Sequence, residues 1–185
     1  MLQEYEAIDV ALEKLHILTG KDYLLKLREI TNMKVFKELE NHKNIFYTGG
    51  RSEEDLNNLL EAAEKAVRLG YTVYILPNPA TTRSGDLILL RNRYIRLYEL
   101  KTIIGKNSVD NRLKDSIGQS NSVLLNIASV INHYRLAKAI KDYFYYNSTA
   151  QRVLVFKNRR EILIKRQSIK SDFEKKFRGL WYKNK

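Results

Sequence analysis

An aspartate, a glutamate and a lysine occupy the ends of two neighbouring apolar runs in the middle of the chain. Asp86 opens the first run, and Glu99 and Lys101 close the second. If the runs form a β-hairpin with a two-residue loop at Asn92-Arg93, paired positions sum to the same number and Asp86 faces Glu99. Because side chains alternate along a strand, Lys101 joins Glu99 on that face while Leu100 points to the other.

This arrangement predicts a binding site for a divalent metal ion. Two carboxylates ~4 Å apart repel each other by about 4 kcal/mol at an effective dielectric constant of 20, unless a cation lies between them. Mg²⁺ or Mn²⁺ held by Asp86 and Glu99 would bind a phosphodiester oxygen and activate a bound water. Lys101 would orient that water and stabilise the charged transition state, and the carbonyl oxygen of Leu100 is a candidate further ligand. Zn²⁺ is less expected, because the chain has no Cys.

Polar residues flank the predicted hairpin at the same end as the three charged residues. They suit contact with substrate phosphates and are Thr82, Arg83 and Ser84 upstream, with Thr102 and Lys106 downstream. The two runs themselves are strongly apolar, which favours central strands over a solvated hairpin. The alternative interpretation is a solvated hairpin end with a Glu–Lys pair that contributes little to stability.

The charge of the chain is unevenly distributed. The net charge is +12, yet residues 1–50 hold seven Lys or Arg and eight Asp or Glu, whereas residues 51–185 hold 26 and 13. A surface this basic favours a nucleic acid as partner, because phosphate backbones bind it through counterion release. The apolar stretches are too short for a membrane span, and the first residues lack the basic start of a signal peptide. We therefore expect the chain to act in a cytoplasm.

Periodicity in apolar residues predicts the elements that must position these groups. Residues 1–50 form a near-neutral helical segment, with helices expected over 2–18, 21–30 and 33–39, and Gly49-Gly50 marks its end. Residues 51–185 form a basic α/β domain. Its expected helices span 52–69, 109–119, 132–146 and 169–178, and its expected strands span 71–76, the hairpin, 123–127, 152–156 and 162–165. This order predicts an α/β sandwich with a mixed sheet.

One part of the chain, Leu59 to Ile127, resembles a known superfamily. It contains LLEAAEKAVRLGYTVYILP, SGDLILL, YELKTIIG and RLKDSIGQSNSVLLNI in that order. These stretches resemble the PD-(D/E)XK nucleases of restriction-endonuclease-like fold, and most resemble the nuclease domains of contact-dependent growth inhibition toxins and related polymorphic or phage-borne toxins. The resemblance implies an αβββαβ core, metal ligation by Asp86 and Glu99, and contact of Lys101 with the reacting phosphate or water. Gly85 stands where the superfamily's name places Pro.

The resemblance also implies two further site residues and a biological setting. A third acid often comes from the helix before the first strand, and Glu64 suits this role better than Glu61, which lies further into solvent on the helical wheel. Gln119 ends the following helix, where the family has a Gln. The resemblance implies an endonuclease toxin that cleaves RNA, with tRNA the favoured substrate, inside the cytoplasm of a target cell. Such a toxin is neutralised by a cognate immunity protein, which here would be acidic.

Three other interpretations remain open at this point. The same metal chemistry suits a DNA endonuclease of a defence, restriction or mobile-element system. Without catalysis, the basic domain would be a nucleic-acid-binding module. A metal-independent ribonuclease could use a His such as His133 with a Lys or Tyr. Tyr143, Tyr145 and Tyr146 lie beside lysines and suit either contact with unstacked bases or burial in a core.

Overall fold

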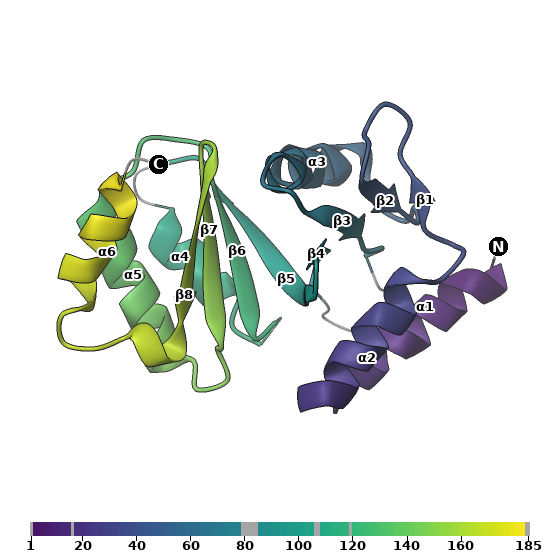
Figure 1. Cartoon of the computed structure of the whole chain (residues 1–185), viewed down its shortest axis with the longest axis horizontal. Coiled ribbons are helices and arrows are strands. Elements are labelled where there is room, and N and C mark those ends of the chain that lie inside the picture. The colour runs from purple at the N-terminus through teal and green to yellow at the C-terminus, as the bar shows by residue number, and fades with distance from the viewer. Residues whose placement is uncertain (1, 16, 79–84, 106–107, 119, 184–185) are drawn as a thin grey trace. The chain divides into compact units, whose positions relative to one another are not determined.

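The computed structural model describes residues 2–15, 17–78, 85–105, 108–118 and 120–183 (Figure 1). The chain divides into two compact units, which are residues 1–98 (unit 1) and 99–185 (unit 2). In the described ranges, eight strands form a mixed sheet in the order β1 to β8, accompanied by six α-helices. Strand β5 (Tyr94–Ile103) crosses the division, so its first half belongs to unit 1 and its second half to unit 2.

Unit 1 is a small mixed sheet with helices on both faces. Its helices are α1 (Leu2–Leu15), α2 (Gly20–Thr31) and α3 (Glu53–Arg68), and its strands before β5 are β1 (Lys37–Glu38), β2 (Ile45–Tyr47), β3 (Thr72–Ile75) and β4 (Leu87–Arg91). Figure 1 shows α3 on one side of these strands and α1 with α2 on the other. The apolar side chains of α1 and α2 pack with Ile88, Ile95 and Leu97, which share one face of the β4–β5 hairpin.

The hairpin has the register that the sequence predicts. Arg91 pairs with Tyr94 and Leu87 pairs with Tyr98, so paired positions sum to the same number. Asn92, in the two-residue loop, has φ of 54°, a left-handed conformation that Asn tolerates better than most residues. At the open end of the hairpin, the Asp86 N–H donates to the Tyr98 carbonyl oxygen at 2.8 Å.

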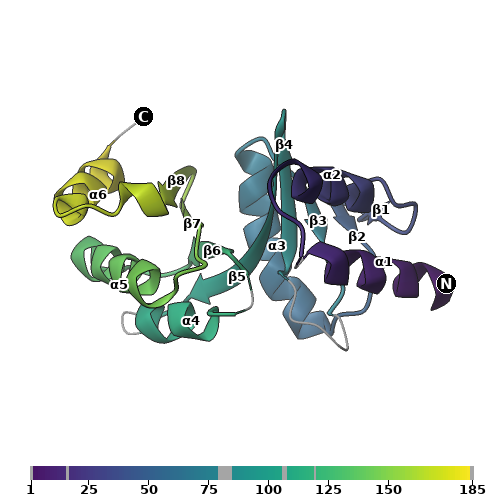
Figure 2. The same ribbon diagram turned by 90° about the horizontal axis from the view of Figure 1, so that it is seen from below.

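Unit 2 is a sheet with three helices on one face. Strands β5 and β6 (Ser122–Ile127) are parallel, β6 and β7 (Arg152–Lys157) are parallel, and β8 (Arg160–Lys165) returns antiparallel to β7. The helices are α4 (Val109–Asp115), α5 (His133–Tyr146) and α6 (Phe173–Tyr182), and a 3₁₀ turn spans Arg166–Ser168. Figure 2 shows α4, α5 and α6 beside these strands, and a shared apolar core joins them to Ile103, Val123 and Val153.

The element order confirms the fold class, since α3, β3, β4, β5, α4 and β6 form the expected αβββαβ series. The prediction of a helix over 33–39 is wrong, because Lys37–Glu38 is a strand paired with β2 and Phe36 packs edge-on against the Tyr74 ring. The strands β1 and β2 were not predicted. A domain boundary at residue 50 stays a prediction. Of the described helices, none is long and apolar enough to cross a membrane.

Gly85 precedes Asp86 where the backbone of β5 comes closest, and we expect Gly85→Ala to destabilise the hairpin. A Cβ at this position would lie 2.8 Å from the Tyr98 carbonyl oxygen and 2.9 Å from the Leu97 side chain. The backbone must shift to relieve this overlap, and we expect the free energy of unfolding to fall by about 1–3 kcal/mol. Denaturant unfolding measures the change.

Gly105→Ala is the matched control. A Cβ there meets nothing within 4 Å. It should leave stability unchanged or raise it slightly, because Ala reduces the entropy of the unfolded chain. Equal stability of the two variants would show that the hairpin end tolerates a side chain at position 85.

Candidate functional site

Strand β5 carries a buried ion pair at the start of unit 2. The Lys101 Nζ lies 2.7 Å from the Glu99 Oε1, and the two side chains are 13% and 8% exposed. This contact agrees with the predicted alternation, which places both residues on one face of the strand. Ile103, the next residue on that face, belongs to the apolar core beneath α4 and α5. Glu99 and Lys101 therefore lie at the polar end of an otherwise apolar surface.

In unit 1, Asp86 is bound by an arginine that the sequence analysis did not identify. Arg51 donates from one terminal nitrogen to the Asp86 Oδ1 at 2.9 Å and from the other to the Asp55 Oδ2 at 2.8 Å. Its Nε donates to the Leu76 carbonyl oxygen at 2.7 Å. The Arg51 side chain is 5% exposed, whereas that of Asp86 is 17% exposed. Three hydrogen bonds thus anchor the buried guanidinium, and one of them holds the Asp86 carboxylate.

Arg51 also explains how α3 is linked to the hairpin end within unit 1. Ser52 caps the helix by accepting from the Asp55 N–H, so Asp55 sits in the first turn and faces back toward Arg51. The four-residue spacing from Arg51 to Asp55 is visible in the sequence and suits an ion pair. The contact with Asp86 joins residues 35 positions apart, and no local pattern could reveal it.

Glu64, the predicted third acid, has other partners. Its carboxylate lies 3.4 Å from the His42 Nδ1 and 3.7 Å from a terminal nitrogen of Arg68, and its side chain is 45% exposed. The acid of α3 that shares a cation with Asp86 is Asp55. A catalytic role for Glu64 stays a prediction, and these contacts give it no support.

The remaining predicted site residues are only partly described. Leu100 is buried opposite Leu124, and Thr102 is half-buried opposite Asn126 in the β5–β6 ladder. The other residues of the predicted site lie outside the described residues, and they are Thr82, Arg83, Ser84, Lys106 and Gln119.

A buried tyrosine of α5 lies within electrostatic range of Glu99. Burial raises the pKa of the Tyr143 hydroxyl, and the Glu99 carboxylate raises it further. The side chains of Ser116 and Asn147 act in the opposite direction by hydrogen bonding, as does the charge of Arg166. Tyr143 therefore stays protonated at neutral pH, and the C-terminal end of α5 lies at the Glu99 end of unit 2.

His133 packs between α5 and α6 and is nearly enclosed. The residue is 9% exposed, its Nδ1 lies 3.2 Å from the Tyr182 hydroxyl, and the Tyr134 ring lies alongside. Burial lowers the pKa of His133, and the charges of Arg178 and Lys157 lower it further. The ring is therefore neutral at pH 7 and packed as part of the unit 2 core, which does not favour a role as an accessible general base.

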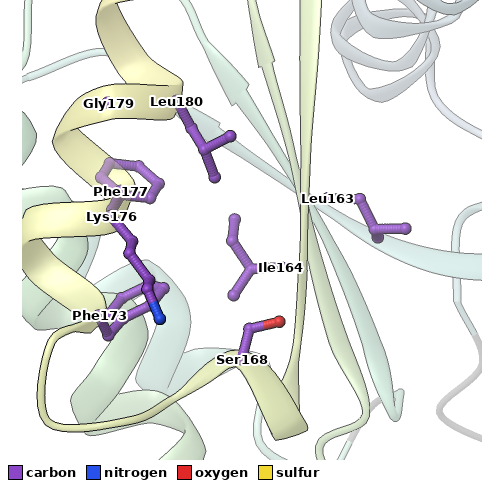
Figure 3. A pocket seen from close by; sticks show the side chains of 8 residues that line it. All are labelled: Leu163, Ile164, Ser168, Phe173, Lys176, Phe177, Gly179 and Leu180. Carbon is purple, nitrogen blue, oxygen red and sulfur yellow. The ribbon is translucent and has the colours of Figure 1, made fainter.

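An apolar cavity of about 470 Å³ lies between β8 and α6 in unit 2 (Figure 3). Ile164, Phe173 and Phe177 point into it, and Ser168 and Lys176 are its polar residues. No acid lines this cavity, so its chemistry differs from that of the predicted metal site. Within the described ranges, no group of three or more His, Asp or Glu side chains is arranged to hold a metal ion.

Comparisons with known proteins assign the chain no family. Its sequence matches no protein family and no curated protein. Its structure is similar to one from Burkholderia pseudomallei described as a CdiA-CT/CdiI toxin and immunity complex, with a TM-score of 0.43 and 19% sequence identity. The similarity covers 62% of this chain and 89% of the other. A TM-score this low carries no argument about activity.

Removing Arg51 should destabilise unit 1 more than removing an exposed arginine. Arg51→Met leaves the half-buried Asp86 carboxylate without the guanidinium, and we expect the free energy of unfolding to fall by about 2 kcal/mol or more. Arg135→Met is the control, because its Asp110 pair is exposed and should contribute at most about 1 kcal/mol. Urea unfolding of both variants tests this, and equal losses would contradict it.

The neutral state of His133 predicts a loss of stability in acid. Because its pKa is lowered in the folded protein, the unfolded chain binds the proton more readily once the pH falls below about 6.5. Stability should therefore decrease as the pH falls from that value toward the folded-state pKa. His133→Gln should flatten this part of the pH profile. An unaltered profile in His133→Gln would rule out this group as its source.

Proposed function

We propose that the chain is a metal-dependent endonuclease that hydrolyses phosphodiester bonds in RNA. The observation that supports this most is the buried Glu99–Lys101 pair, which directly follows a hairpin with the predicted register. If the same register continues for one more residue, Asp86 lies opposite Glu99, and the proposal includes this pairing. Charged side chains are rarely this buried, so the burial of the pair favours a role in chemistry over a role as surface charge.

The donor set fits a magnesium ion. Mg²⁺ prefers oxygen ligands and is held in proteins by one or two carboxylates together with waters and substrate phosphates. Asp86 and Glu99 supply carboxylates, and the Leu100 carbonyl is the further candidate. Mn²⁺ suits the same oxygens, whereas Zn²⁺ suits them less because the site offers neither Cys nor His. When bound, the ion would supply Lewis-acid activation of the phosphate and of a water.

The side chains of the chain itself have distinct roles in this proposal. Lys101 donates to the reacting phosphate or to the attacking water, and it stabilises the charge that develops in the transition state. Glu99 orients Lys101 through their 2.7 Å contact. Arg51 orients Asp86 and holds it at the end of β4. Thr82, Arg83, Ser84, Thr102 and Lys106 are proposed to contact substrate phosphates.

The preference for RNA, and for tRNA within it, comes from the resemblance of the motifs to nuclease domains of contact-dependent growth inhibition toxins. The excess of Lys and Arg in residues 51–185 supports a polyanionic substrate of either kind. The proposed ligands do not distinguish RNA from DNA. A DNA endonuclease is therefore the alternative within the same chemistry, and a binding module without catalysis is the alternative outside it.

As a toxin, the chain would act in the cytoplasm of a target cell and would need an inhibitor in the producing cell. An acidic immunity protein is the expected inhibitor, because it would complement the basic surface and associate rapidly. Residues 1–50 would then assist delivery or support the fold.

The nuclease proposal predicts that cleavage requires a divalent metal ion and that substitution of each proposed site residue lowers kcat. Incubation with tRNA and with supercoiled plasmid in Mg²⁺ should cleave the tRNA, and EDTA should abolish cleavage without abolishing binding. Asp86→Asn, Glu99→Gln and Lys101→Met should each lower kcat by about 100-fold or more, because each removes a group used in the transition state. Gel analysis of cleavage and circular dichroism of each variant measure activity and folding.

Asp110→Asn and Lys176→Met are the matched controls, since both residues form exposed ion pairs elsewhere in unit 2. They should retain activity within about twofold. Cleavage of plasmid but not of tRNA would replace the RNA proposal with the DNA alternative. Binding without cleavage in any metal would favour the non-catalytic module.

A further inference from the structure

Two neighbouring aromatic rings are exposed at the C-terminal end of α5. The side chains of Tyr145 and Tyr146 are 81% and 72% exposed, and their ring centroids lie 5.0 Å apart at an interplanar angle of 89°. Tyr143 and Phe144, which directly precede them on the same helix, are buried in the unit 2 core. The packing of α5 therefore uses the first two rings and leaves the second two in contact with water.

This end of α5 is held by contacts rather than left to fray. Arg166 donates to the carbonyl oxygens of Phe144 at 2.9 Å and of Ala150 at 2.7 Å, and it also donates to that of Asn147. The Asn147 N–H donates to the Tyr143 carbonyl oxygen at 3.0 Å. Capping these carbonyl groups fixes the helix end. Tyr145 and Tyr146 thus project from a rigid backbone, which lowers the entropy cost of using them for binding.

The exposed rings lie at the same end of unit 2 as Glu99. The Glu99 carboxylate acts on the Tyr143 hydroxyl, which is two residues before Tyr145. The register agrees, because Glu99 pairs with Val123 at the start of β6, and β7 begins next to Ser122. α5 leads into β7 at this end, as the ribbon of Figure 1 shows.

The charges near the rings favour a polyanion. Lys138 and Lys141 lie in the two preceding turns of α5, where the Lys141 Nζ is 3.5 Å from the Glu174 carboxylate, and Arg152 and Lys165 lie at this end of β7 and β8. Aromatic faces beside cations are the usual surface for unpaired nucleotides, because the bases stack on the rings while the cations contact phosphates. A duplex hides the faces of its bases, so such a surface selects unpaired segments.

We propose that Tyr145 and Tyr146 form a base-stacking surface that binds unpaired nucleotides at the Glu99 end of unit 2. The inference rests on the proposed function, since it takes a nucleic acid as the ligand, and it narrows the substrate to RNA with single-stranded segments. The two tyrosines are binding residues in this proposal and take no part in the bond cleavage.

The test compares Tyr145→Ala/Tyr146→Ala with Tyr145→Phe/Tyr146→Phe. Binding of a fluorescent unstructured RNA oligonucleotide and of an RNA duplex of equal length is measured by anisotropy in EDTA, where cleavage is blocked. The alanine variant should bind the unstructured RNA with an affinity lower by about tenfold or more, because removing each ring removes its stacking interaction with a base. Its affinity for the duplex should change by less than about twofold, and the phenylalanine variant should bind like the wild type.

Cleavage assays in Mg²⁺ give an independent readout. The alanine variant should raise KM for an RNA with an unpaired loop while kcat stays within about twofold, since only substrate binding is affected. Unchanged affinity of the alanine variant for unstructured RNA would overturn the inference. Equal weakening for single strand and duplex would also overturn it. If the wild type binds RNA as expected but cleaves nothing, the proposed function fails while the stacking surface stands.

Discussion

Strand β5 must pair its backbone with two different neighbours along its length. Tyr94–Tyr98 pair with the antiparallel β4, and Glu99–Ile103 pair with the parallel β6. Because buried backbone groups need hydrogen-bond partners, the two ladders fix the register of β5. Alternation along the strand then sets the face that each side chain takes. This register brings the charged Glu99 and Lys101 beside Val123 and Leu125, on a face of the β5–β6 ladder that is otherwise apolar. The electrostatics of the candidate site follow from that placement.

The parts of the fold that the sequence predicted are those encoded by local signals. The β4–β5 and β7–β8 hairpins turn through Asn-Arg pairs, Asn92-Arg93 and Asn158-Arg159, and in each the Asn has φ of 54°. A two-residue loop leaves one choice of register, so the pairing of β4 with β5 could be calculated from residue numbers. Helix α3 was equally clear, because Ser52 and three acids mark its start and Gly70 follows its end.

The parts that were missed depend on residues far apart in the chain. Residues 33–39 show apolar spacing that suits a helix, but Lys37–Glu38 pairs with β2 and β2 in turn pairs with β3. A strand of two residues carries almost no pattern of its own, and only its neighbours define it. The same holds for Arg51, whose importance lies in a contact with Asp86, 35 residues later. The helical wheel favours Glu64 because it reports the exposure of a side chain, but it does not report the partners of that side chain.

Buried ion pairs contribute little to stability, so stability alone does not explain the Arg51–Asp86 and Glu99–Lys101 pairs. The desolvation of Arg51, Glu99 and Lys101 costs about as much as their pairing returns, so apolar residues of similar size would serve folding equally well. Their presence is easier to explain if the charges are used. In the proposed site, each carboxylate already has a cation of its own, which reduces the charge available to a metal ion. A divalent ion would then bind weakly to the protein alone and firmly once substrate phosphates complete its ligands, so that metal binding and substrate binding are coupled.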